Sequence, residues 1–137
     1  MRAALVMVIV AGVAGWSVSC VDRMPDQDRR ILTAVPVAKM SADILWKDYQ
    51  TNATQARRMY FRQPIVISGV VTSVGTDAPG DRFLMFGQTE KNGVRANLLD
   101  EQAADLLKSV PPDKRVTLKC FCEGLKGDVI LKSCVKP

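Results

Sequence analysis

The longest uninterrupted apolar stretch of the chain lies at its N-terminus. Residues 3–21 carry no charged side chain, Arg2 precedes them, and the small residues Ser17 and Ser19 stand near their end. A positive residue, an apolar core and a small-residue cleavage region together form the pattern of a bacterial secretory signal. We therefore expect an exported protein that is periplasmic, or membrane-anchored and facing the periplasm or the exterior.

Three fates are open for residues 1–19. Cleavage after Ser19 would release a soluble protein. Lipidation of Cys20 would anchor it instead: Val18 and Ser19 fit the positions before an acylated cysteine, whereas Ser17 departs from that pattern. The segment is also long enough to remain as an uncleaved anchor, since a membrane span needs about 17–25 apolar residues. The membrane is therefore an expected partner in two of the three cases.

Residues 20–37 have a different composition from the rest of the chain. Between residues 21 and 37 three acidic side chains balance three basic ones, and Pro25 and Pro36 interrupt any helix. We expect a flexible tether here, followed by one domain over residues 38–137.

Apolar residues recur at three- and four-residue spacing after Ser41, which can cap a helix. They are Ile44, Leu45, Tyr49, Ala53, Ala56 and Tyr60. The spacing predicts one helix with one apolar face, and Gln63 and Pro64 end its pattern.

Runs of β-branched and alternating apolar residues predict five strands. They span residues 65–74, with a bend at Gly69, and then residues 82–87, 94–98, 114–122 and 128–135. Between the third and fourth strands, Asp100 begins a short helix that Pro111 and Pro112 stop. This order is typical of the OB barrel. The predicted fold is mainly β with α: a five-stranded OB-type Greek-key barrel preceded by an N-terminal helix.

Two segments carry a resemblance to a known family. One is the helix-to-strand passage with Leu45, Tyr49, Asn52, Ala56 and Tyr60, followed by residues 65–74. The other is the closing segment over residues 116–124 and 128–131 with Cys134. Across residues 41–135 the chain resembles the bacterial tRNA-anticodon-domain-like OB-fold proteins, many of them secreted proteins or lipoproteins. The resemblance implies the OB fold and leaves the ligand open, because a fold does not determine a function.

The domain contains Cys120, Cys122 and Cys134, and export would place them in an oxidising compartment. The resemblance favours a disulfide between Cys122 and Cys134, and it places Cys120 where a glycine or another small residue is expected. One cysteine would then stay unpaired or pair between chains.

Simple hairpin geometry opposes that pairing. If Glu123 lies opposite Asp128, Cys134 faces Thr117, five positions from Cys122 along the strand, which exceeds disulfide reach unless a bulge or bend intervenes. The alternative is a reduced set of cysteines that binds Cu(I) or Zn(II). Structural zinc normally takes four ligands, and no histidine is available, so no metal site is predicted.

The absence of histidine removes the commonest general base and the usual partner of a nucleophilic serine or cysteine. No glycine-rich phosphate loop occurs either. Asp77 and Asp81 flank a turn and are interpreted as turn formers. We therefore predict no catalytic residue and no cofactor.

A candidate ligand face follows by analogy with OB barrels, which bind through their second and third strands and the adjoining loops. The residues are Arg82, Phe83, Arg95, Asn97 and Lys126. An arginine beside an aromatic ring can hold a polyanion or stack on a base or sugar. The formal net charge of +5 is scattered along the chain, so it favours acidic partners only mildly.

The leading hypothesis is a non-enzymatic, envelope-associated OB-fold binding module of unknown ligand. The second is an envelope protein that contacts another protein or acts in stress protection. Binding of single-stranded nucleic acid or another polyanion comes third, because export argues against a nucleic-acid partner. The sequence indicates no oligomeric state.

Overall fold

The computed structural model describes residues 27–77, 80–89, 92–111 and 113–137. The signal segment, Cys20 and the first part of the predicted tether lie outside these residues. Within the described ranges, no helix has the length and hydropathy needed to cross a membrane.

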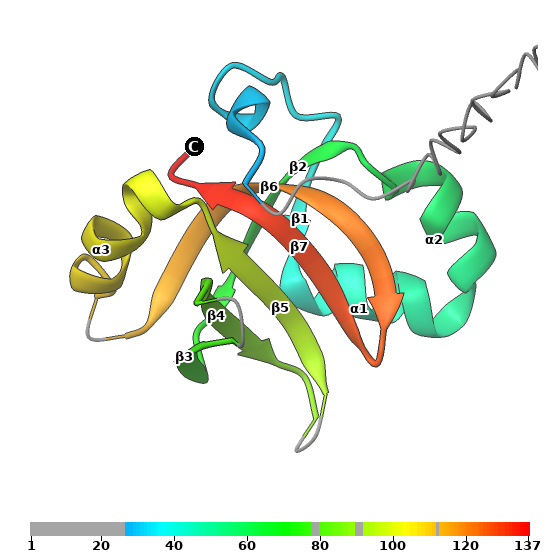
Figure 1. Ribbon diagram of the computed structural model, residues 1–137. Helices are drawn as coiled ribbons and strands as arrows, with labels where there is room; N and C mark the ends of the chain where they lie inside the picture. Colours follow the sequence, from blue (N-terminus) through cyan, green and yellow to red (C-terminus); the bar gives the residue numbers. More distant parts are fainter. Residues whose placement is uncertain (1–26, 78–79, 90–91, 112) are drawn as a thin grey trace, which may run out of the picture.

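Over the described residues the fold is mixed α and β, with a seven-stranded sheet and three α-helices. Figure 1 shows their arrangement. In chain order the elements are the 3₁₀ helix η1 (Arg29–Leu32), β1 (Ala38–Ser41), α1 (Ala42–Thr51), α2 (Ala53–Tyr60), β2 (Pro64–Val70), β3 (Ser73–Thr76), β4 (Arg82–Gly87), β5 (Gly93–Leu98), α3 (Asp100–Lys108), β6 (Arg115–Lys126) and β7 (Asp128–Val135). In Figure 1, α1 and α2 lie on one side of the sheet strands and α3 on the other.

The sheet order is β1-β2-β6-β7-β5-β4-β3. All five predicted strands are present, but the first is divided into β2 and β3, which lie near opposite ends of this order. The division falls at Val71 and Thr72 rather than at Gly69, which lies inside β2. A Cβ at Gly69 would approach the Phe86 ring to 3.0 Å and the Ala42 Cβ to 3.2 Å, so close packing explains that glycine.

The predicted single helix is two helices. Ser41 caps α1 as expected, accepting from the Ile44 N–H at 3.3 Å. The backbone leaves the helical conformation at Asn52, whose side chain accepts from the Gln55 N–H at 3.1 Å and begins α2. Because of this break, the buried face is made by Leu45, Tyr49, Ala56 and Tyr60, while Ile44 and Ala53 are exposed.

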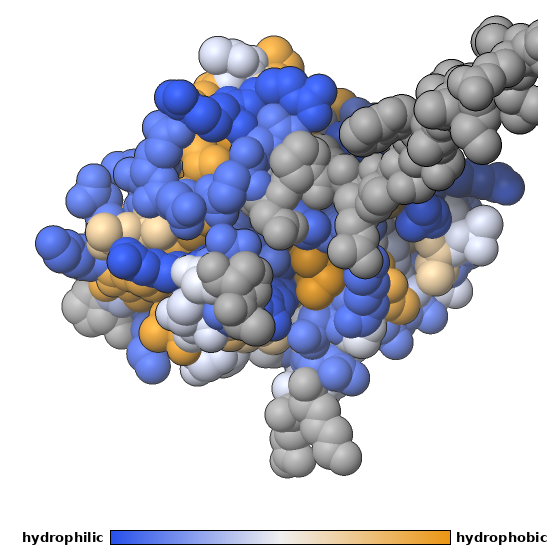
Figure 2. Space-filling model, in the orientation of Figure 1, coloured by the Kyte–Doolittle hydropathy of each residue, from blue (hydrophilic) through white to orange (hydrophobic). Residues whose placement is uncertain are grey.

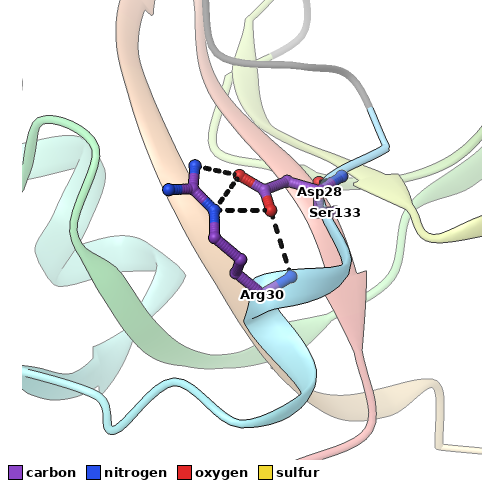
Figure 3. Close-up of polar contacts among 3 residues, drawn as sticks. All are labelled: Asp28, Arg30 and Ser133. Carbon is purple, nitrogen blue, oxygen red and sulfur yellow. Dashed lines mark hydrogen bonds and ion pairs between the residues drawn. The ribbon is translucent and has the colours of Figure 1, made fainter.

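Residues 27–37 belonged to the predicted flexible tether, yet they pack on the domain; we call them the N-terminal arm. Ile31 is fully buried against Leu99, Phe121 and Val135. The Asp28 N–H donates to Ser133 Oγ at 2.8 Å, and Figure 3 shows the Asp28 carboxylate facing the Arg30 guanidinium. The packed part of the chain therefore begins before the predicted domain boundary at residue 38.

The predicted disulfide between Cys122 and Cys134 is wrong: Cys134 pairs with Cys120, with a Cα–Cα distance of 4.3 Å. The strand β6 continues to Lys126, which lies opposite Asp128, so the hairpin is tighter than expected. Two register shifts, one at each side of Phe121 and Cys122, then bring Cys120 to Cys134.

Candidate functional site

The outer face of β4 and β5 gathers three of the five predicted ligand-face residues. Phe83 lies opposite Asn97, and Met85 lies opposite Arg95. The alternating residues on the other face are buried in the core; they are Leu84, Phe86, Val94, Ala96 and Leu98. Phe86 therefore fills the interior, while Phe83 stays half-buried on the outer face.

Arg95 is the centre of this group. Its Cζ lies 3.9 Å from the centroid of the Phe83 ring, its Nη2 lies 2.9 Å from Asp77 Oδ2, and its Nε donates to Asn97 Oδ1 at 3.2 Å. The Arg95 and Asp77 side chains are each 25% exposed. The guanidinium is thus held in one orientation and its charge is balanced, and Asn97 is buried beneath it at 9% exposure. The group therefore presents the partly exposed Arg95, Asp77 and Phe83 side chains rather than a free cation. We call Asp77, Phe83, Arg95 and Asn97 the sheet-face cluster.

Asp77 was interpreted as a turn former, and it has that role as well. Its Oδ1 accepts from the Asp81 N–H at 3.1 Å, and its own N–H donates to the Asp81 carbonyl at 3.0 Å. Position 75 must be a glycine for the Phe83 ring to keep this place, because a Cβ there would lie 2.6 Å from the ring. The turn before β4 therefore positions the counter-ion, while Gly75, opposite Phe83 in β3, leaves space for the ring.

Arg82 and Lys126 do not join the cluster. Arg82 is adjacent to Phe83 in β4, so its side chain leaves the opposite face of the sheet. Lys126 is paired with Asp128 in the β6–β7 hairpin. The Asp128 carboxylate accepts from the N–H of Gly93, the first residue of β5, at 2.9 Å, so Lys126 lies near the start of β5. Asn97 is at the other end of the same strand. Lys126 instead contacts Glu123 at 3.1 Å.

A second group combines arginine and phenylalanine, and the sequence interpretation missed it. The Arg57 Cζ lies 3.8 Å from the centroid of the Phe61 ring, and the Arg62 Cζ lies 5.0 Å from it. The four-residue spacing between Arg57 and Phe61 is the signal that was available, because such pairs share a helix face.

A third feature is an apolar groove of about 320 Å³ between β3 and α3. It is lined by Val71, Thr72, Ser73, Val74, Leu107, Val110 and Lys114. The strand β3 is the last in the sheet order, so one of its edges is open among the described residues. In Figure 2, apolar surface is visible where Figure 1 places α3 and β3.

The buried thiol of Cys122 has no catalytic environment. Its Sγ lies 3.4 Å from Tyr49 Oη, and burial raises the pKa of Cys122 to about 11. The thiol is therefore protonated at neutral pH and poorly nucleophilic. Among the described residues, no group of three or more His, Cys, Asp or Glu side chains is placed to hold a metal ion.

Comparisons with known proteins agree with this architecture. The model of the tRNA_anti-like family matches residues 1–135. A crystal structure from Klebsiella pneumoniae, described as a "putative nucleic acid-binding lipoprotein", is similar with a TM-score of 0.51 and 12% sequence identity. The similarity covers 82% of this chain and 100% of that one, and it shows a common OB-like fold. No curated protein sequence matches the chain.

Proposed function

The chain belongs to the tRNA_anti-like family, and we propose that it is a non-enzymatic binding module of the bacterial cell envelope. The sheet-face cluster is the observation that carries this proposal. It sets an aromatic ring, a guanidinium, an amide and a carboxylate in fixed positions on the strands that OB folds use for binding. Fixed side chains lose little conformational entropy when a ligand arrives.

Two observations support a non-enzymatic role. The chain has no histidine. The one free cysteine among the described residues is buried and has a raised pKa. A histidine therefore cannot serve as the general base, and the buried Cys122 thiol is unsuited to act as the nucleophile.

We also propose that the sheet closes into the OB barrel. The Val71 N–H donates to the Lys114 carbonyl beside β6, and the next N–H, of Thr72, donates to the Met85 carbonyl in β4, both at 2.8 Å. Two adjacent residues thus connect β4 with the start of β6, which are separated in the sheet order. This connection supports closure of the sheet into a barrel. Slow amide hydrogen exchange at both residues is the expected result.

Export with anchoring at Cys20 completes the proposal. The uncharged segment before Cys20 supports it, and so does the description of the Klebsiella protein as a lipoprotein. Residues 1–19 would be removed, and residues 20–26 would connect the lipid to the N-terminal arm. Mass spectrometry of the processed N-terminus tests this, and a chain that begins at unmodified Val21 or later would contradict lipidation.

The binding proposal is tested by amide NMR of the exported chain, titrated with separate pools of cell-wall fragments, peptides and nucleotides. One pool is expected to shift amides in β4 and β5. Asn97→Ala should abolish those shifts, whereas Lys126→Ala, at the end of β6 and away from Asn97, should leave them unchanged. Shifts that are absent, or that survive Asn97→Ala, would contradict the proposal.

A protein-binding role is the second candidate, favoured by the groove beside the open edge of β3. Val74 is 59% exposed there, and an open strand edge can pair with an extended segment of another protein. Val74→Lys should then abolish capture of a stoichiometric partner from native envelope. A partner retained by this variant would exclude the groove.

Nucleic-acid binding is the third candidate, and the description of the Klebsiella protein favours it. The ion pair between Asp77 and Arg95 counts against it on this face, because the arginine is already neutralised. A gel-shift experiment at physiological salt that shows no retarded oligonucleotide would exclude it.

A further inference from the structure

We propose that the groove between β3 and α3 binds a small anionic amphiphile, a molecule with one apolar chain and one negatively charged head, such as a fatty-acid carboxylate. None of the described residues that line this groove belongs to the sheet-face cluster. The inference therefore goes beyond the proposed function. It assigns the groove a small ligand in place of the protein segment considered as the second candidate.

The volume of the groove suits a small molecule. Sites for small ligands usually measure about 300–1,000 Å³, and this groove of about 320 Å³ lies at the lower end of that range. A water molecule occupies about 30 Å³ in the liquid, so the groove has room for about ten groups of that size. A stable contact with another protein usually buries more than about 1,000 Å² and would extend well beyond the groove. The size therefore favours a short single chain.

Apolar side chains on both sides of the groove are still in contact with water. On the β3 side, Val71 is buried, whereas Val74 is 59% exposed. On the α3 side, Leu107 and Val110 are only half-buried. Covering these surfaces is favourable in proportion to the apolar area removed from water. An apolar chain that lies between β3 and α3 would cover both sides at once.

The charged group of the groove is a cation without a counter-ion. Lys114 is the only charged residue in the described lining, and it forms no ion pair with any described residue. Its neighbour Asp113 accepts from the Arg115 N–H at 3.1 Å instead. The Ser73 hydroxyl, also in the lining, makes no hydrogen bond to a described residue. A single carboxylate head would thus meet one positive charge and one hydrogen-bond donor.

The backbone at Lys114 is held in an uncommon conformation at the edge of the groove. Its φ is 58°, in the left-handed region that residues with a Cβ seldom adopt. The Lys114 N–H donates to the Pro111 carbonyl, and the Lys114 carbonyl accepts from the Val71 N–H, both at 2.8 Å. Glycine would take this conformation without strain, so the backbone does not require a lysine here. Residues kept in such conformations cluster at ligand-binding sites, which supports a role for this side chain in binding.

The test is amide NMR of the full chain in phosphatidylcholine nanodiscs, titrated with octanoate below its micelle concentration. Octanoate is expected to shift the amides of the groove residues, which are Val71, Thr72, Ser73, Val74, Leu107, Val110 and Lys114. 1-Octanol keeps the chain without the charge, and butanoate keeps the charge with a shorter chain. At equal free concentration each should bind at least about fivefold more weakly. Octanoate that shifts none of these amides, or that binds no more tightly than 1-octanol or than butanoate, overturns the proposal.

A pair of lysine variants tests the head of the ligand. Lys114→Gln removes the charge but keeps a flexible polar side chain, and octanoate should bind it about fivefold more weakly. Lys108→Gln removes the same charge from the last turn of α3, outside the groove lining, and should change the affinity less than about twofold. Equal losses in the two variants would overturn the site, because net charge alone would then explain binding.

A pair of valine variants tests the chain of the ligand. Val74→Thr makes one side of the groove more polar at nearly constant shape, so octanoate and 1-octanol should both bind about threefold more weakly. Val35, 81% exposed in the N-terminal arm and outside the groove lining, is the matched control, and Val35→Thr should leave both affinities unchanged. Unchanged octanoate binding in Val74→Thr would overturn the placement of the chain. An unchanged thermal unfolding midpoint confirms that each variant is folded.

The outcome is separable from that of the proposed function. If a ligand pool shifts amides in β4 and β5 while octanoate does not bind, the sheet-face cluster stands and this site falls. If octanoate binds in the groove and no pool affects β4 and β5, the groove site stands and the sheet-face cluster falls. If octanoate does not bind and Val74→Lys abolishes capture of a protein, the groove takes a protein segment and the amphiphile is excluded.

Discussion

Cys122 and Tyr49 meet inside the domain, and each changes the chemistry of the other. Burial raises the pKa of both groups, for Cys122 to about 11. The Tyr49 hydroxyl and the Cys122 thiol lie within hydrogen-bonding distance, so neither polar atom is left without a partner. A free thiol can therefore persist in this domain next to a disulfide without reacting.

The first prediction concerns that thiol. In the Cys20→Ser chain, Cys122 is expected to resist a thiol reagent at pH 8 in native buffer and to react once denaturant unfolds the domain. The measurement is the number of thiols labelled per chain over time. Rapid labelling without denaturant would show that Cys122 is accessible and would contradict the buried position.

The second prediction concerns the disulfide. Cys120 and Cys134 are 14 residues apart in sequence, and a crosslink closing a loop of this size stabilises a protein by about 3 kcal/mol. The double variant Cys120→Ala, Cys134→Ala should therefore lower the free energy of unfolding in urea by about that amount. The Cys122→Ala variant keeps the crosslink between Cys120 and Cys134. On reduction, its electrophoretic mobility should therefore change by the same amount as that of the parent chain.

At the scale of elements, the N-terminal arm acts as part of the fold. Gln27 Nε2 donates to the Leu98 carbonyl at 3.2 Å, and Gln27 Oε1 accepts from the Asp100 N–H at 2.8 Å, so the arm satisfies the first turn of α3. Lys119 Nζ donates to the carbonyls of Leu32 and Ala34. These contacts, with Ile31 as the buried anchor, attach the arm at both of its ends.

The third prediction tests the arm. Ile31→Ala removes a fully buried side chain and is expected to lower the free energy of unfolding by about 3 kcal/mol. Leu32, 38% exposed, is the neighbouring control, and Leu32→Ala should cost about 0.5 kcal/mol or less. Limited proteolysis should also cut the arm faster in the Ile31 variant. Equal effects of the two substitutions would show that the arm is not anchored by Ile31.

At the scale of the whole molecule, two acidic groups connect stability to pH. Hydrogen bonds from Arg30 hold the pKa of Asp28 below its ordinary value. Burial raises the pKa of Glu123, but hydrogen bonds from Lys132 and Lys126 outweigh it and leave that pKa lowered as well. In both cases the unfolded chain binds a proton more readily than the folded one.

The fourth prediction follows from these signs. The contribution of both carboxylates to stability is complete above their ordinary pKa values of 3.8 and 4.5 and is lost as the pH falls through their lower folded values. Urea unfolding at pH 7, 5 and 3 should show a falling free energy of unfolding below about pH 5. The fall should be smaller in Asp28→Asn and in Glu123→Gln. A free energy that stays constant down to pH 3 would contradict both shifts.

Local patterns in the sequence were sufficient for much of the fold. The helix cap at Ser41, the alternation of Val94, Ala96 and Leu98, and the short helix beginning at Asp100 were all predicted, because each depends on neighbours within a few residues. The sequence also named Phe83, Arg95 and Asn97 as ligand-face candidates, but it grouped Arg82 with them, which period-two alternation places on the other face of β4. Its predictions for residues 1–26 lie outside the described residues.

Contacts between distant segments decided the rest. The tertiary structure packed Ile31 against three residues from later in the chain and set the register that pairs Cys120 with Cys134. It placed Asp77 beside Arg95. It also brought Arg57 beside the hairpin that contains Gly124. These outcomes depend on strand register, bulges and chain reversal, and a shift of one residue would change the partner or the face of every side chain involved. The sequence alone thus predicted most of the helices and strands, whereas the tertiary structure decided the break at Asn52, the division of the first strand and which side chains meet.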